Sequence, residues 1–270
     1  MLRDYQIEMK TRLMEAWKAH RSVMVQMPTG TGKTHLLASV VSEFVSSAGS
    51  GVWLIAHRRE LVAQMEETLA KYGIRREDTP VRVMSVQWLS RHWNEAGDAP
   101  GLIVIDEAHH ALAASYTEMW KRYPAAKKLG VTATPCRLNR RGFTELFEVL
   151  VTSWSIAEFI EKGVLSVFDY VSIRPGSEEQ RLIDGLEKRG ADGDYQVKEM
   201  DAVLNRRPGI ERLYRSVRQF ASGKKGMVYA ISIEHARRIA EYYSRRGVNA
   251  VAVDSKTPAM AVSYTHLRAH

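Results

Sequence analysis

The chain has 270 residues, of which 45% are hydrophobic and 26% charged, proportions typical of a globular protein with a substantial core. Its formal net charge of +8 favours a polyanionic partner, and its single cysteine, Cys136, excludes an internal disulfide framework. The amino terminus is charged and no apolar run approaches about 18 residues, which argues against a secretory signal or membrane span and favours a cytoplasmic protein.

The first elements in chain order are a helix, a strand and a second helix. Apolar and aromatic residues recur every four positions in the opening helix, at Tyr5, Met9, Leu13 and Trp17. The apolar run 23–25 predicts a buried strand. Farther on, apolar side chains at helical spacing predict the next helix: Leu37, Val40, Val41, Phe44 and Val45.

Residues 27–34 join this strand to the second helix and read Met-Pro-Thr-Gly-Thr-Gly-Lys-Thr. The two glycines let backbone N–H groups converge on a phosphate without obstruction by Cβ atoms, and the helix start adds a positive end. Lys33 is then placed to reach the β- and γ-phosphates, and the Thr34 hydroxyl to ligate Mg²⁺. The strict form of this motif begins with glycine, whereas this sequence has Met27.

A second motif follows the apolar run 102–105, which predicts another buried strand and ends in the adjacent carboxylates Asp106 and Glu107. Ligands of open parallel sheets bind at the carboxyl ends of the strands, so the two motifs are predicted to meet at one sheet edge. Converging N–H groups, a lysine and paired carboxylates are the parts of a magnesium–nucleotide site. The sequence therefore predicts that the chain binds ATP and Mg²⁺.

The first domain is predicted to be an α/β fold. Strands are expected at 52–56, 81–85, 102–106 and 129–133. Helical stretches such as 61–72 separate them, and this alternation predicts a parallel sheet covered on both faces. We expect this domain to span 1–150 and a connecting segment with a helix at 156–162 to span 151–167.

A second α/β block is predicted at 168–258. Its expected strands are 168–173, 227–231 and 248–253. A helix is expected at 234–246, and the polar span 177–207 is typical of helices joined by loops. The pattern stops near Pro258, and residues 259–270 fit no expected element. We interpret the block as an incomplete second domain followed by a non-native tail.

The order of these motifs resembles that of the superfamily 2 helicases, in the DEAD/DEAH-box group with restriction-subunit and DNA-repair ATPases. The matching stretches run through most of the chain: 3–6, 27–34, 55–64, 83–89, 106–109, 132–135 and 227–236. The resemblance implies a RecA-like P-loop NTPase domain followed by an incomplete second RecA-like domain.

The resemblance also implies roles for individual residues. The nucleotide would be bound by Arg3, Tyr5, Gln6, Pro28, Thr29, Gly30, Thr31, Gly32, Lys33 and Thr34. Thr34 and Asp106 would hold Mg²⁺, and Glu107 would orient and deprotonate the attacking water. The catalytic residues would be Glu107, Lys33 and His109. His109 is expected to act as a hydrogen-bonding switch to the coupling residues Thr132, Ala133 and Thr134.

Candidate nucleic-acid contacts follow two of the predicted strands. Arg58 and Arg59 stand at a predicted helix start, a place suited to a nucleic-acid phosphate, although a pair of solvated arginines is the alternative. Gln87 is expected to contact the nucleic acid or to pack in the core. The resemblance favours DNA over RNA, and we expect a monomer.

The function implied by the resemblance is an ATP-dependent helicase or translocase, in which hydrolysis is coupled to movement on nucleic acid. In this family the second domain supplies arginine fingers from a motif that this sequence lacks, so we expect the 270-residue chain to hydrolyse ATP poorly and to be inactive as a motor. The motor part of a restriction endonuclease subunit and a nucleotide-dependent nucleic-acid-binding protein without motor activity are the alternatives.

Overall fold

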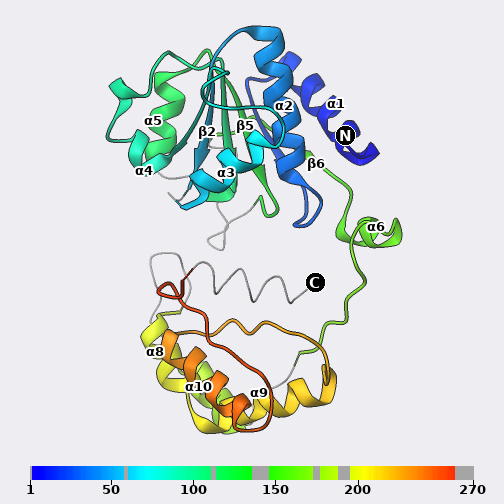
Figure 1. Ribbon diagram of the computed structural model, residues 1–270, viewed down its shortest axis with the longest axis vertical. Helices are drawn as coiled ribbons and strands as arrows, with labels where there is room; N and C mark the ends of the chain where they lie inside the picture. Colours follow the sequence, from blue (N-terminus) through cyan, green and yellow to red (C-terminus); the bar gives the residue numbers. More distant parts are fainter. Residues whose placement is uncertain are drawn as a thin grey trace. The chain divides into compact units, whose positions relative to one another are not determined.

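The computed structural model describes residues 2–57, 60–110, 114–135, 146–172, 177–187 and 195–258. The chain divides into two compact units, Met1–Val167 and Phe168–His270 (Figure 1). The first unit therefore includes the segment expected to connect the two domains. Arg58, Arg59, Cys136 and the expected tail at 259–270 lie outside the described residues.

The first unit is built on a six-stranded, wholly parallel sheet with the strand order β3-β2-β4-β5-β1-β6. The strands are β1 (Ser22–Gln26), β2 (Val52–Ala56), β3 (Val81–Ser85), β4 (Leu102–Asp106), β5 (Lys127–Thr132) and β6 (Val149–Thr152). The predicted parallel α/β sheet is thereby confirmed. The sequence does not predict β6, because a strand of four residues at a sheet edge, two of them half-buried, one buried and one exposed, gives little periodicity.

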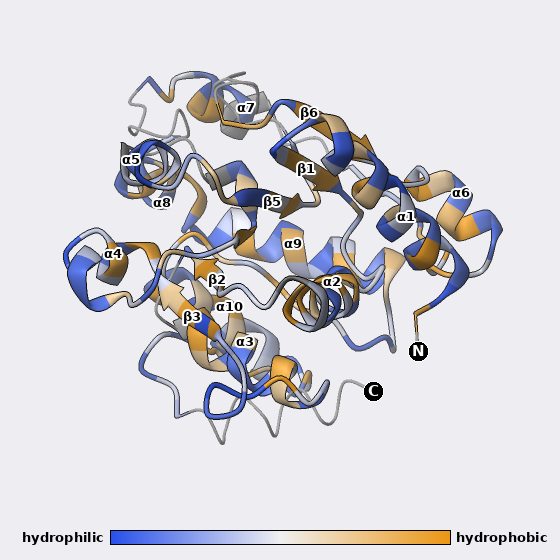
Figure 2. Cartoon of the chain, turned by 90° about the horizontal axis from the view of Figure 1, so that it is seen from above, coloured by the Kyte–Doolittle hydropathy of each residue, from blue (hydrophilic) through white to orange (hydrophobic). Residues whose placement is uncertain are grey.

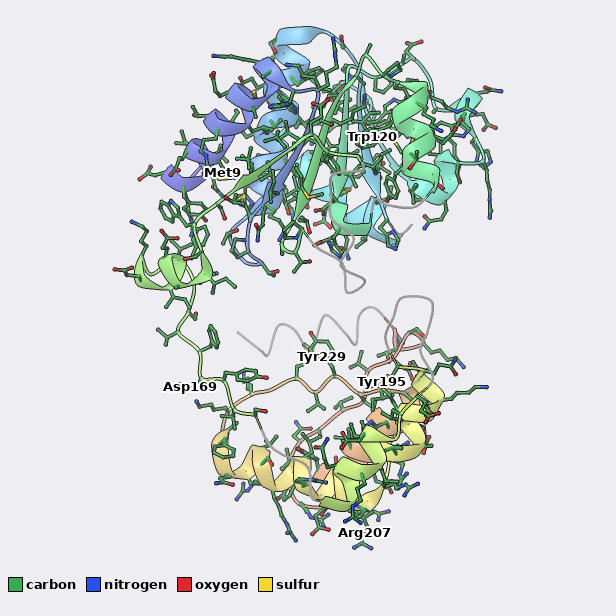
Figure 3. All side chains as sticks on the ribbon, turned by 180° about the vertical axis from the view of Figure 1, so that it is seen from behind. Met9, Trp120, Asp169, Tyr195, Arg207 and Tyr229 are labelled. Atoms are coloured by element: carbon green, nitrogen blue, oxygen red, sulfur yellow. The ribbon has the colours of Figure 1, made fainter. Side chains whose placement is uncertain are left out.

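Helices cover both faces of this sheet, as Figure 1 shows for α2 and α5. One face carries α1 (Asp4–Ala19), α2 (Lys33–Ala48), α3 (Glu60–Ala70) and α6 (Ile156–Glu161), and the other carries α4 (Val86–Leu89) and α5 (Ala114–Arg122). Met9 and Trp120 mark the two layers in Figure 3. Burial on both faces explains why β2 is wholly hydrophobic and why β1 is hydrophobic at its three central positions (Figure 2).

The ladder of the sheet places the ends of three strands side by side. β5 lies between β4 and β1. Gln26 at the end of β1 is paired with Thr132, and Asp106 at the end of β4 is paired with Val131. Because all three strands are parallel, their carboxyl ends form one edge, which is the edge that the sequence predicts for the two motifs.

The described part of the second unit is mainly helical. Its helices are α7 (Ser177–Asp184), α8 (Val197–Leu204), α9 (Arg207–Phe220) and α10 (Ile233–Ser244). A small core forms where α9 packs on α10, around Ile210, Ile239 and Tyr243. The predicted helix at 234–246 is thus present, one residue earlier at its start and two at its end.

The second unit differs from the sequence prediction in its strands. The three expected strands have no regular secondary structure within residues 168–172, 227–231 and 248–253. Many of their apolar side chains are exposed, and Tyr229 is 91% exposed, whereas Ala230, Val248 and Ala250 are partly buried against the small core of this unit. An apolar run becomes a strand only when a neighbouring strand completes its hydrogen bonds, and the described residues supply no such neighbour here. The incompleteness of this domain stays a prediction.

The described helices do not meet the requirements for crossing a membrane. None of them combines the length and the apolar character that crossing a bilayer would require.

Gly130 in β5 allows the turn after β4 to lie directly on the sheet. A Cβ atom at this position would lie 2.5 Å from Phe147 Cζ and 2.8 Å from Ala108 Cβ. Ala108 begins the 3₁₀ turn Ala108–His110, which follows the two carboxylates at the end of β4. The close approach therefore positions the segment that carries Glu107 and His109.

We predict that Gly130→Ala lowers the free energy of unfolding by about 1–3 kcal/mol, because overpacking displaces Phe147 or Ala108. Urea unfolding followed by tryptophan fluorescence measures this, since all six tryptophans precede residue 155 and so report on the first unit. Gly51→Ala is the matched control, because its Cβ would meet the nearest atom at an ordinary 3.5 Å. Equal midpoints for the two variants would contradict the prediction.

Candidate active site

The loop between β1 and α2 is anchored to the sheet at Met27. This side chain is fully buried in the core that α1 and α2 cover, and its backbone N–H donates to the Thr132 carbonyl at 3.0 Å. The position that is glycine in the strict motif therefore has its side chain in the core here. The methionine is accommodated because that core has room for it, and the phosphate-binding part of the loop begins after it.

Two glycines give the loop its shape. Gly30 and Gly32 have φ angles of +84° and +77°, the left-handed region that favours glycine. A Cβ at Gly30 would lie 3.2 Å from Leu165 Cδ2, and a Cβ at Gly32 would collide with the Gln6 amide nitrogen. Gly32 also caps α2 without a side-chain hydrogen bond. The first N–H groups of α2 are thus presented to an anion in the manner of a phosphate-binding helix start.

Residues of α1 hold the loop in this conformation. Tyr5 Oη donates to the Thr31 carbonyl at 3.0 Å. The Gln6 amide nitrogen donates to the carbonyls of Thr31 and Gly32 at 3.1 and 3.2 Å, while its oxygen accepts from the Arg3 N–H at 2.8 Å. Gln6 is only 3% exposed. The structure therefore places Gln6 against the loop backbone, and its role in adenine recognition stays a prediction.

The remaining loop residues surround the start of α2. Thr31 is buried, and its hydroxyl donates to the Pro28 carbonyl at 2.7 Å. Lys33 is half-buried and its ammonium donates to the Met27 carbonyl at 3.5 Å, whereas Thr29 and Thr34 are exposed. A long, weak bond of this kind leaves Lys33 able to exchange the carbonyl for a phosphate oxygen.

The carboxylate of Asp106 lies at the end of β4 in a partly desolvated position. Burial raises the pKa of Asp106, and the negative charge of Glu107 adds to this. The Glu107 N–H, which donates to Asp106 Oδ1 at 2.9 Å, and the charges of Lys33 and His109 act in the opposite direction. A buried carboxylate is costly to the fold and favourable for a divalent cation, which suits a metal ligand.

Glu107 adopts a strained backbone conformation. Its φ angle is +49°, and it is the one non-glycine residue with a positive φ in the described part of the chain. Such a conformation costs of order 1 kcal/mol and persists where the surroundings impose it, often at functional sites. Here it turns the Glu107 carboxylate to within 3.3 Å of His109 Nδ1.

A chain of polar contacts runs from Glu107 to the end of β5. His109 Nδ1 lies 2.9 Å from Thr132 Oγ1, which in turn accepts from the Thr134 N–H at 3.1 Å. The carbonyl of Ala133 accepts a long bond from the Gln26 amide at 3.5 Å. The contact between His109 and Thr132 that the resemblance implies is therefore present. The coupling role of these residues stays a prediction.

Of the three candidate nucleic-acid contacts, Gln87 lies within the described residues. Gln87 is exposed, and its amide donates to the His57 carbonyl at 2.7 Å. Gln87 thus braces the end of β2, immediately before Arg58 and Arg59, which lie outside the described residues. The proposed role of all three in nucleic-acid binding stays a prediction.

Sequence reasoning missed one group of residues that supports the loop. Trp154 and Phe159 pack on Tyr5 with ring centroids 5.5 and 5.0 Å apart, so α6 rests on α1. Leu165 follows α6 and meets Gly30. These contacts join positions more than 100 residues apart, and no local pattern in the sequence reveals them.

The residues present fit a nucleotide-bound magnesium ion. No group of three or more His, Cys, Asp or Glu side chains gathers to hold a metal in the described ranges. Asp106 and the Thr34 hydroxyl by themselves make an incomplete oxygen shell, and Mg²⁺ commonly completes such a shell with phosphate oxygens and water. The left-handed glycines and the uncapped start of α2 provide the matching phosphate site.

Known proteins are similar to this chain over the region that carries these motifs. Residues 1–137 match the family described as "Type III restriction enzyme, res subunit". The chain is 28% identical over 237 residues to a 51.5 kDa protein of Lactococcus phage (isolate 7-9), covering 87% of this chain and 49% of that protein. It is 28% identical over 205 residues to the DNA 3'-5' translocase XPB2 of Sulfurisphaera tokodaii, covering 70% and 44%. The chain thus spans about half the length of these curated relatives.

Among solved structures, the chain is similar to a fragment assigned as an HsdR subunit of a type I restriction enzyme from Vibrio vulnificus. The TM-score is 0.60 at 17% sequence identity, and the match covers 98% of this chain and 47% of that one. At this identity the likeness shows the fold alone, an α/β domain built on a parallel sheet.

We predict that Asp106→Asn stabilises the metal-free protein while removing a candidate Mg²⁺ ligand. Asparagine keeps an oxygen for the Glu107 N–H but buries no charge, so we expect a gain on the order of 1 kcal/mol, or about 2–4 °C in Tm. Thermal unfolding followed by tryptophan fluorescence measures it. Asp98→Asn, at an exposed position of the same unit, should leave the Tm unchanged. A lower Tm for Asp106→Asn would show that its charge is needed by the fold itself.

Proposed function

The chain belongs to the family of the type III restriction enzyme res subunit and carries a superfamily 2 helicase-like ATPase domain, and we propose that it is the ATP-binding core of a DNA helicase or translocase. The resemblance inferred from motif order is confirmed at the level of the family. The observation that supports the proposal is the meeting of the glycine loop, the Asp106–Glu107 pair and Thr132 at one edge of the sheet.

In this proposal the phosphates bind to the N–H groups at the start of α2 and to Lys33. Thr34 and Asp106 hold Mg²⁺, which when bound neutralises charge on the phosphates. Glu107 orients the attacking water and takes its proton. Positioning accounts for most of the catalysis of phosphoryl transfer, so the strained backbone that orients the Glu107 carboxylate is part of the proposed mechanism.

Adenine recognition is proposed for the start of α1. Arg3, Tyr5 and Gln6 lie next to the loop, and Gln6 already bonds to its backbone. The Gln6 side chain would then both contact the nucleotide and hold the loop in its shape. His109 and Thr132 extend from the other side of the site, and we propose that they, with Ala133 and Thr134, report the state of the phosphates to the rest of the protein.

DNA is the proposed polymer. The relative from Sulfurisphaera tokodaii is named a DNA translocase, and the net charge of +8 suits a polyanion. Arg58, Arg59 and Gln87 are the proposed contacts in the first unit. This sequence holds no segment of the Gln-x-x-Gly-Arg-x-x-Arg type, so we propose that the 270-residue chain hydrolyses ATP slowly and does not move along DNA by itself.

A second candidate is the motor part of a restriction endonuclease, which the description of the matching family favours. A third is a clamp that binds nucleic acid in a nucleotide-dependent way without movement. Duplex DNA that accelerates ATP turnover by the chain would support a motor, and DNA binding that depends on ATP without such acceleration would support the clamp.

We predict that Glu107→Gln lowers ATP turnover by about 100-fold or more and leaves nucleotide binding within about twofold, because the amide cannot take the proton but disturbs no phosphate contact. Phosphate release under single-turnover conditions and the Kd of a fluorescent ATP analogue separate the two effects. Glu95→Gln is the matched control, since Glu95 is exposed in the same unit away from the site.

Two other results would contradict the role proposed for Glu107. Unchanged turnover in Glu107→Gln would mean that the hydrolysis arises elsewhere or from a contaminant. A parallel loss of nucleotide binding would mean that Glu107 is needed for the shape of the site rather than for the chemical step.

A further inference from the structure

The positive charge of the chain is concentrated in one short segment of the second unit. Residues 206–225, which comprise α9 and the turn after it, contain seven basic residues and one acidic residue, Glu211. Their net charge is +6, so the other 250 residues together contribute only +2. The basic residues are Arg206, Arg207, Arg212, Arg215, Arg218, Lys224 and Lys225.

The packing of α9 decides which way these charges point. Its apolar side chains face α10, where Ile210 joins Ile239 and Tyr243 in the small core of the second unit. The Tyr214 and Tyr243 rings meet edge to face with centroids 5.1 Å apart. This contact fixes the rotation of the helix, so the opposite face of α9 is turned toward solvent.

Three arginines share that outward face. At 100° per residue, Arg207, Arg215 and Arg218 fall within a quarter turn of one another. All three are exposed, and Arg207 points outward from the helices in Figure 3. They lie 11 positions apart from first to last, roughly 16 Å along the helix axis, which is the rise of about five phosphates of one DNA strand.

Little in the described structure neutralises these three charges. The Arg215 side chain is 76% exposed and pairs with Glu211 at 2.7 Å, an i,i+4 surface pair of a kind that contributes little to stability. The arginines of α10 differ from them, because Arg238 donates to the carbonyl and side chain of Asn205 and Arg237 pairs with Asp254. The cations of α10 therefore support the fold, whereas Arg207, Arg215 and Arg218 of α9 are exposed to a ligand.

We propose that the outward face of α9, formed by Arg207, Arg215 and Arg218, is a docking surface for the phosphate backbone of duplex DNA. Guanidinium groups match phosphate oxygens in pairs, and a row of them positions a duplex without reading its bases. A membrane surface fits less well, because a helix that lies on lipid inserts an apolar face, and the apolar face of α9 is occupied by α10. The choice of DNA rests on the proposed function.

The test uses the whole chain without nucleotide. Binding of a fluorescein-labelled duplex is followed by anisotropy from about 50 to 200 mM NaCl, which spans the range where phosphate contacts dominate. The triple variant Arg207→Gln, Arg215→Gln and Arg218→Gln should lower the slope of log K against log salt by about 2.7, or about 0.9 for each phosphate that the variant no longer neutralises. Affinity should fall on the order of tenfold or more, and most at the lowest salt concentration, because the two lines converge as salt rises.

The matched control removes the same charge elsewhere. Lys71→Gln, Arg75→Gln and Arg76→Gln lie at exposed positions between α3 and β3, at the amino-terminal edge of the sheet. This control should retain the wild-type slope. Glutamine is a good helix former, and circular dichroism of both variants checks that α9 is intact.

Three outcomes would overturn the proposal: equal losses in the triple variant and the control, no loss in either, or no DNA binding by the wild-type chain. A further binding experiment replaces the DNA with vesicles of phosphatidylcholine that contain about 30% phosphatidylserine. If the wild-type chain bound these vesicles and the triple variant did not, while DNA binding stayed unchanged, the face would be assigned to a membrane. That result would also overturn the proposal. Failure of the ATPase proposal is separate, because this measurement contains no nucleotide and does not depend on ATP turnover.

Discussion

The hydrogen bonds that β5 makes on both of its sides determine where the candidate site lies. On one side β5 pairs with β1, which leads into the glycine loop, and the Met27 N–H continues that ladder to the Thr132 carbonyl. On the other side it pairs with β4, which ends at Asp106. A parallel ladder cannot shift by one residue without turning every buried side chain to the wrong face, so the three strand ends are held in fixed register.

The site is built from local conformations that weaken the fold. Gly30 and Gly32 are in left-handed conformations, Glu107 carries backbone strain, and Asp106 is a partly buried charge. Proteins retain such features where binding or chemistry requires them, and the surrounding structure compensates. Here the compensation comes from the core of the sheet and from Tyr5 and the Gln6 amide, which hold the loop from α1.

The candidate catalytic residues and most of the net positive charge lie in different units. The first unit holds the paired carboxylates, the lysine and the glycine loop of the candidate ATPase site. The second unit holds most of the net positive charge, on a helix whose apolar face is used for packing. A polyanion is attracted by long-range charge before it makes specific contacts, so a basic face outside the nucleotide site is compatible with an ATPase that acts on DNA.

Local patterns were enough to predict β2, β3 and β4 residue for residue and to place Lys33 and Asp106 at strand and helix ends, because periodicity and glycine turns are properties of neighbouring residues. The strand order, the β6 edge, the Gln6 contact with the loop and the packing of Phe159 on Tyr5 follow from long-range contacts. So does the absence of ladders within the described parts of 168–253, where the apolar runs look like strands in the sequence. A strand needs a partner, and partners are chosen by the folded chain.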